Sequence, residues 1–363
     1  MRLYRMELYK LFHRKIFITG ALAVIGLMLL YFWIAEVDSE ISVIDGRVYS
    51  GYEAIQMNRK ITEEFKGEIS NDKIEQIIKK YGLPMKYEEN MPGWRDGNYL
   101  NDFVTRYFTN GSWETRTIPT ERYEFEETEL GKVYHDLESS PFLYYTTGWK
   151  VFVDMLQFSL VLGSILIICG ISVVFAEENQ TKMLPVIFTT EEGRNKDVIA
   201  KVAASFTLTA IIFICAVILN LTLCKIVYGL DGYDNISGIV LANNWFSPAY
   251  RIPFPQYLCT LLCLGFQALL SLCAITLCIS AHQSSSFTSV IVSAICWGIP
   301  VLLRMFFGGF MWIIVYATPV FLIMNTVFSD IYAMWYLVFA INLFVSVVCL
   351  IKGAIYYKTR QVA

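Results

Sequence analysis

Long apolar runs alternate with polar segments along this chain. Each run is about as long as the roughly 20 helical residues that cross the hydrocarbon core of a bilayer. None carries more than one charged residue. The pattern therefore predicts six membrane-spanning helices, at residues 16–34, 151–176, 202–228, 257–281, 287 to about 303, and 334–351.

The first 15 residues show a different pattern. Tyr4, Leu8 and Phe12 recur at helical spacing on one stripe, and Lys10 and Arg14 lie on another. A basic helix with an aromatic and apolar face lies in the headgroup plane of a membrane. We expect residues 1–15 to form a cytoplasmic amphipathic helix, an elbow that leads into the first span.

Composition and charge narrow the class of protein. Of the 363 residues, 55% are hydrophobic and 17% are charged, against about 25% charged in ordinary soluble chains. Residues 36–150 hold 22 of the 32 acids but 14 of the 29 bases. These features exclude a soluble globular enzyme. They also exclude a nucleic-acid binder, because no basic face remains for phosphate.

The bases set the orientation in the membrane. Twelve of them lie in the first 15 residues, the loop 177–201 and the tail after 351, whereas the short loops of the opposite side carry Arg251 alone. Because positive loops stay in the cytoplasm, both termini should be cytoplasmic and residues 35–150 extracellular. The number of spans must then be even.

An additional apolar stretch at 305–325 is interrupted by Gly308, Gly309 and Pro319 and follows Arg304. A full crossing would place the basic tail outside. We therefore expect a re-entrant or tilted hairpin on the outer side, before the sixth span, buried against protein. One long bent span that begins near 287 is the alternative.

The segment 35–150 is long enough for a small α-rich domain. Helices are predicted at Ser50–Phe65 and at Asn71–Tyr81, where Gly82 and Pro84 end the second one. The stretch 121–138 has seven acids and lacks the pattern of a calcium loop. It is either a solvated acidic face or a site for cationic peptides or drugs.

No catalytic set is visible. The nine cysteines all lie in apolar runs and follow no ligand spacing, and the sequence has no Walker A, GxSxG or HExxH motif. We expect no catalytic residue, no cofactor and no metal in this chain, which should not be an enzyme.

The loop 177–201 is the most informative segment. It uses 25 residues where a simple connection needs a few, and it holds five apolar residues: Met183, Leu184, Val186, Ile187 and Phe188. Apolar side chains outside the bilayer must be buried against something. A docking surface for a soluble partner explains them better than a slack loop.

This loop resembles that of the type-two ABC export permeases. In that family a span ends in Phe followed by one or two acids, a Thr precedes a short coupling helix, and a Gly/Ser-Arg-x-Lys run leads to a Lys that opens the next span. The matching residues here are Phe175, Glu177, Glu178, Thr181, Met183–Phe188, Gly193-Arg194-Asn195-Lys196 and Lys201. Gln180 stands where the family usually has Gly. The elbow, the six spans and the outer element before the last span also fit.

The resemblance implies a permease subunit of an ABC exporter in a bacterial plasma membrane. A separate ATP-binding subunit would bind ATP and Mg, and a second permease copy or a paralogue would complete the pathway. The substrate is not readable. The residues expected to dock the ATPase subunit are Glu177, Glu178, Met183, Leu184, Ile187, Phe188 and Arg194.

Two further hypotheses rest on the residues. Asp154 and Lys225 lie near the outer ends of adjacent antiparallel spans, so they could form an interhelical ion pair or an outer gate. The alternative to transport is a membrane receptor or immunity protein that binds a ligand through residues 35–150.

Overall fold

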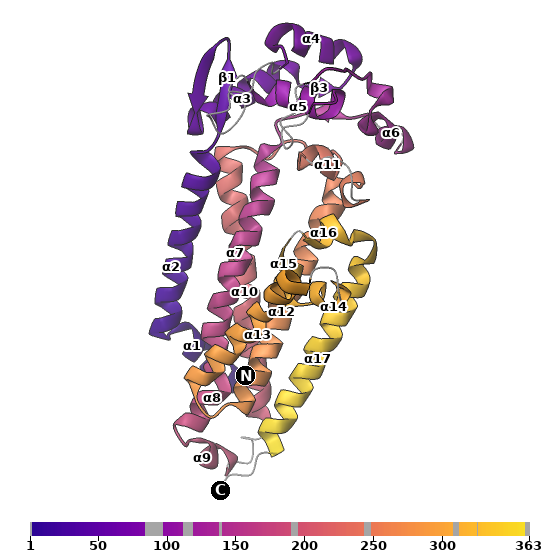
Figure 1. Cartoon of the computed structure of the whole chain (residues 1–363). Helices are drawn as coiled ribbons and strands as arrows, with labels where there is room; N and C mark the ends of the chain where they lie inside the picture. Colours follow the sequence, from indigo (N-terminus) through magenta and orange to yellow (C-terminus); the bar gives the residue numbers. More distant parts are fainter. Residues whose placement is uncertain are drawn as a thin grey trace. The chain divides into compact units, whose positions relative to one another are not determined.

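The computed structural model describes residues 2–83, 97–111, 119–137, 140–189, 195–242, 248–307, 312–324 and 326–359 (Figure 1). The contacts divide the chain into two compact units. The first unit comprises residues 1–28, 156–219 and 259–363, and the second comprises residues 29–155 and 220–258.

The six predicted spans are confirmed as helices. Each is long and apolar enough to cross a membrane. The chain therefore has the helical architecture of a multi-pass membrane protein. The described helices of this kind are Lys15–Val37, Thr147–Gln180, Lys196–Val227, Phe254–His282, Ser286–Phe307 and Tyr332–Thr359. In Figure 1 they are α2 (Lys15–Tyr31) with the π-helical η1 (Phe32–Val37), α7 (Thr147–Ile171) with α8 (Val173–Gln180), α10 (Lys196–Val227), α12 (Phe254–His282), α13 (Ser286–Phe307), and η4 (Tyr332–Met334) with α17 (Trp335–Thr359).

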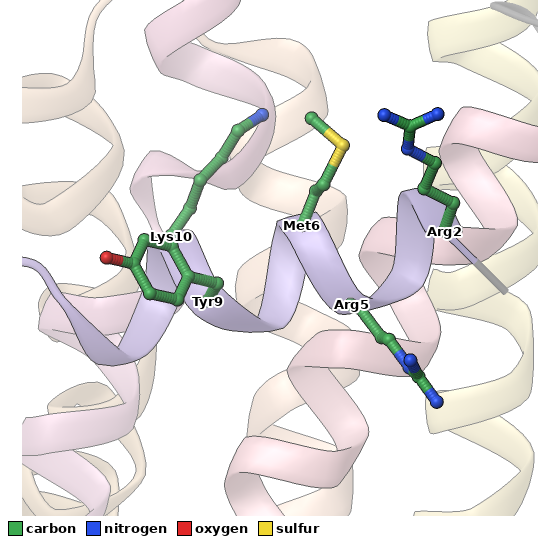
Figure 2. A pocket seen from close by; sticks show the side chains of 5 residues that line it. All are labelled: Arg2, Arg5, Met6, Tyr9 and Lys10. Carbon is green, nitrogen blue, oxygen red and sulfur yellow. The ribbon is translucent and has the colours of Figure 1, made fainter.

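The N-terminal residues form a helix, α1 (Arg2–Phe12). Its apolar stripe faces the protein, because Leu11 is buried and the hydroxyl of Tyr4 lies 2.9 Å from that of Thr207. Figure 2 shows Arg2, Met6 and Lys10 on one side of α1 and Arg5 on the opposite side.

The described residues between α13 and α17 form short helices. They are α14 (Trp312–Tyr316), α15 (Pro319–Ile323) and α16 (Thr326–Asp330). Every residue of α15 is buried. The amide of Asn342 on α17 donates to the carbonyl of Ala317 at 2.8 Å and accepts from Gln267 on α12 at 3.0 Å. The irregular backbone is therefore anchored by buried amides.

In the second unit, a hairpin that the sequence analysis did not predict follows η1. Strands β1 (Ile41–Ile44) and β2 (Arg47–Ser50) pair antiparallel around Asp45 and Gly46, both at positive φ. An Asp-Gly pair is typical of such a turn, because both central residues must adopt left-handed conformations. A second, shorter pair joins β3 (Gly67–Glu68) to β4 (Phe142–Leu143).

Four helices follow the predicted α-rich pattern. They are α3 (Gly51–Phe65), α4 (Asn71–Tyr81), α5 (Tyr99–Phe108) and α6 (Glu129–Asp136), with a 3₁₀ turn η2 (Phe125–Glu127) before the last. The first two coincide with the predicted ranges to within one residue. Side chains cap the N-termini of α5 and α6. At α5 the side-chain oxygen of Asn98 accepts from the backbone amide of Asn101, and the side-chain oxygen of Asn101 accepts from the backbone amide of Asn98. At α6 the hydroxyl of Thr128 accepts from the backbone amide of Gly131.

The apolar core of this unit includes residues from beyond 35–150. Ile236 and Ile239, beside and within α11 (Ser237–Val240), pack with the core of α3 to α6. Tyr107 donates to the carbonyl of Gly238 at 2.9 Å, and Tyr134 bonds Asn235 at 3.2 Å. The domain therefore needs the loop between the third and fourth long helices, which ends with η3 (Pro248–Arg251).

Candidate functional site

The candidate site lies in the first unit, where the α7–α8 helix ends. The helix breaks at Ser172, and the hydroxyl of Ser280 on α12 occupies the break. Ser280 Oγ donates to the carbonyl of Ser172 at 2.7 Å and accepts from the amides of Phe175 and Ala176 at 3.1 Å. A side chain inserted into the hydrogen-bond ladder is a known cause of such a break.

Beyond the break, Glu178 joins a buried charge network. Lys201 on α10 is 1% exposed. Its Nζ lies 2.5 Å from Glu178 Oε1 and also contacts the carboxylate of Asp197. The hydroxyl of Tyr357 on α17 donates to the other oxygen of Glu178. This satisfies both the buried ammonium and the carboxylate of Glu178.

Aromatic rings close the network. Lys201 Nζ lies 5.8 Å from the ring centre of Phe175 and 5.6 Å from that of Tyr357, both within cation–π range. The two rings are 4.6 Å apart. The charged end of Lys201 is therefore held by two acids and two ring faces.

The neighbours of Glu178 bond to other segments. Glu177 pairs with Arg14, between α1 and α2. Asn179 donates to the carbonyl of Gln283 at 2.8 Å, and Gln180 accepts from the amide of Ser286 at 3.1 Å, so both hold the α12–α13 turn. We call Glu177–Gln180 the hub, because its four side chains hold four separate parts of the first unit.

A short helix, α9 (Leu184–Phe188), follows the hub, and Lys182 at positive φ makes the turn between them. Figure 1 shows α9 beside the C-terminal end of α17. The ring of Phe188 packs edge-on against that of Tyr357, with centres 5.5 Å apart. Tyr357 therefore touches both α9 and the charge network.

The side chains exposed around α9 are only partly those that the sequence analysis expected to dock the ATPase subunit. Leu184 is buried in its own chain, and Ile187 and Phe188 are half-buried. The exposed apolar side chains are Met183, at 51%, and Val186, at 59%. A five-residue helix shows no period from which the sequence could assign its outer face. Arg194 lies outside the described residues.

The predicted pair of Asp154 and Lys225 is not formed. Asp154 is half-buried and Lys225 is exposed, and no ion pair among the described residues joins them. The depth argument placed both residues near one level of adjacent helices, but it could not fix the direction of each side chain around its helix.

A second polar cluster lies in the second unit and was missed by the sequence analysis. Glu40, Asp102, Arg106 and Lys150 line a cavity of about 270 Å³. Burial raises the pKa of Glu40 to about 7; Glu36 and Asp102 add to the rise, and Lys150 opposes it. Asp102 and Arg106 are a local pair on α5, but Glu40 and Lys150 lie about 60 and 45 positions away in the sequence, so no local pattern brings the four together.

No group of three or more His, Cys, Asp or Glu within the described part of the chain could hold a metal ion. No protein-family model, no curated protein and no solved structure matches the chain.

Proposed function

We propose that this chain is the permease subunit of a bacterial ABC exporter, with α9 as the coupling helix. In this proposal a separate subunit binds ATP and Mg, docks on α9 and supplies the free energy for outward transport. The chain itself is a transport subunit and not an enzyme. A second permease copy or a paralogue forms the other half of the pathway.

The main support for the proposal is the set of bonds that the hub makes. Four consecutive polar residues, Glu177–Gln180, bond to the α1–α2 junction, α10, α17 and the α12–α13 turn. A displacement of α9 would therefore move several long helices together. Such a rigid-body response is what a subunit without an ATP site needs in order to use hydrolysis in a partner.

The exposed face of α9 supports docking. Met183 and Val186 are more than half exposed, although apolar side chains in water favour burial against a partner. Glu178 bonds Lys201 and Tyr357 of the same chain. We therefore propose that it transmits the motion of α9 to α10 and α17, and that it does not contact the ATPase subunit. Glu177 is paired with Arg14 but half-exposed, and it can contribute a charge to the rim of the interface.

The proposed topology follows from the charge bias. Both termini and the hub would be cytoplasmic, and most of the second unit would be extracellular. In that orientation α1 is the interfacial elbow, and the chain around α14 and α15 is the re-entrant element on the outer side, before the sixth span.

The test is co-purification of the tagged full-length chain with its ATPase subunit. We expect Met183→Asp and Val186→Asp to weaken this association at least about tenfold, because a charge would replace an apolar contact at the centre of the interface. Val48→Asp is the matched control, since Val48 is 64% exposed but lies on β2.

Unchanged ATPase association in both α9 variants would contradict the docking proposal. If the wild-type chain purified without any ATPase and bound a ligand through its second unit, the receptor alternative would replace it.

A further inference from the structure

A groove in the first unit combines apolar walls with two bases. It lies between α2, α7 and the start of α13, and its volume is about 830 Å³. Its apolar lining includes Ile16, Val24, Leu27, Ile165, Leu166 and Phe287. Arg14 and Lys15 lie at the end of α2 where the groove begins.

The exposed apolar side chains of the groove walls favour an apolar ligand. Ile16 is 69% exposed and Phe287 is 74% exposed. The helices meet closely only in places: a Cβ on Gly20 would lie 3.2 Å from the side chain of Leu166. Because α2, α7 and α13 are all long enough to cross a membrane, an acyl chain can enter the groove from the bilayer.

The two bases need an anion. Lys15 is exposed, and no ion pair of the described residues includes it. Arg14 bonds Glu177 through one nitrogen, and a guanidinium has further donors for a second acceptor. An apolar helix from a second copy would fill the walls but leave Lys15 without a counter-ion.

We propose that this groove binds an anionic phospholipid, its acyl chain along the apolar walls and its phosphate at Lys15 and Arg14. Basic pockets between membrane helices are suited to anionic headgroups, which they distinguish from zwitterionic ones by charge. Since Arg14 also holds Glu177, the bound lipid would contact the same arginine that ties the hub to the α1–α2 junction. The proposal does not depend on the function proposed above.

The experiment is a lipid titration of the purified full-length chain in detergent, followed by native mass spectrometry. The probes are phosphatidylglycerol and phosphatidylethanolamine with identical acyl chains. We expect at least tenfold tighter binding of phosphatidylglycerol to the wild-type chain. Lys15→Gln should reduce that preference at least threefold.

A pair of tryptophan variants tests the place of binding. Val24→Trp fills the groove and should remove the high-affinity site for phosphatidylglycerol. Leu22→Trp is the control, because Leu22 is on the same helix, is 66% exposed and does not line the groove. Size-exclusion profiles confirm that both variants remain folded.

Equal affinity for the two lipids, or a preference that survives both Lys15→Gln and Val24→Trp, would overturn the proposal. So would a wild-type dimer that Val24→Trp separates without any change in lipid preference, because the groove would then seat a second copy of the chain.

Discussion

At the residue scale, Lys201 is a buried cation that bonds to Glu178 of the hub. Its ammonium is buried between Glu178 and Asp197, and two rings cover it. A buried ion pair adds little net stability over an apolar pair of the same shape, but removing one member leaves an uncompensated charge. The network is therefore better suited to fixing the position of α8 against α10 than to raising stability.

Lys201→Met should destabilise the chain by about 3–5 kcal/mol, because it leaves the buried Asp197 and the half-buried Glu178 without their cation. Lys352→Met is the control, since Lys352 is exposed on α17 and no ion pair of the described residues includes it. The measurement is the thermal unfolding of the purified chain. A fall in Tm of roughly 4–7 °C for Lys201→Met alone is expected; equal falls in both variants would contradict the assigned role.

Glu40 is the residue that should make stability depend on pH near neutrality. Burial raises its pKa to about 7 in the folded chain, with Glu36 and Asp102 adding to the rise and Lys150 opposing it. Between about pH 4.5 and pH 7 the folded state keeps a proton that the unfolded chain releases. Stability from this group is thus lost as pH rises through 7.

We expect the Tm of the wild-type chain to fall between pH 5.5 and pH 8. Glu40→Gln should flatten this slope, because it keeps the shape of the neutral form. Glu53→Gln, a change of an exposed glutamate on α3, should leave the slope as in the wild type. Identical slopes in all three proteins would show that Glu40 does not carry the effect.

At the element scale, the long helices were predictable from the sequence. Twenty-residue apolar runs have one stable form in lipid, because a helix satisfies all of its own backbone groups. The helix Asn71–Tyr81 was also predictable, since isoleucines recur at helical spacing and Gly82, at positive φ, ends it. In both cases the information is local.

Other elements were missed for definable reasons. The Asp45-Gly46 turn carries a local hairpin signal, but β1 and β2 have only four residues each, too few for a clear alternation. The hub contacts were not predictable, because each joins residues more than 20 positions apart. The outward face of α9 depends on Tyr357, which lies at the far end of the chain.

Gly353 sets the spacing of α12 and α17. A Cβ at this position would lie 2.9 Å from the backbone of Cys278, and backbone atoms cannot rotate away. Small residues allow such close approach of membrane helices. Gly353→Leu should therefore force the helices apart and destabilise the chain by about 1–3 kcal/mol or more.

Gly26→Leu is the matched control, because nothing lies within 4 Å of a Cβ on Gly26. The readout is Tm together with the yield of monodisperse protein. If both leucine variants behaved alike, the close contact of α12 and α17 at Gly353 would not be a requirement of the fold.

At the scale of the whole molecule, the hub connects α9 to several long helices, and in the proposed permease this connection would transmit the motion that the ATPase subunit imposes on α9. The hub fastens the base of α9 to the α1–α2 junction, α10, α17 and the α12–α13 turn. Met183, immediately before α9, and Val186, on α9, are exposed. A partner seated on them would act on the long helices through side chains that are already connected.

Site-specific photo-cross-linking tests this account most directly. A photoreactive phenylalanine analogue replaces Val186 in the full-length chain in cells, and a second protein carries it at Val48 as the control. The account predicts a cross-link from position 186 to a soluble protein with a Walker A motif, and none from position 48. A chain that forms no such cross-link at 186 while remaining folded in the membrane would contradict the account.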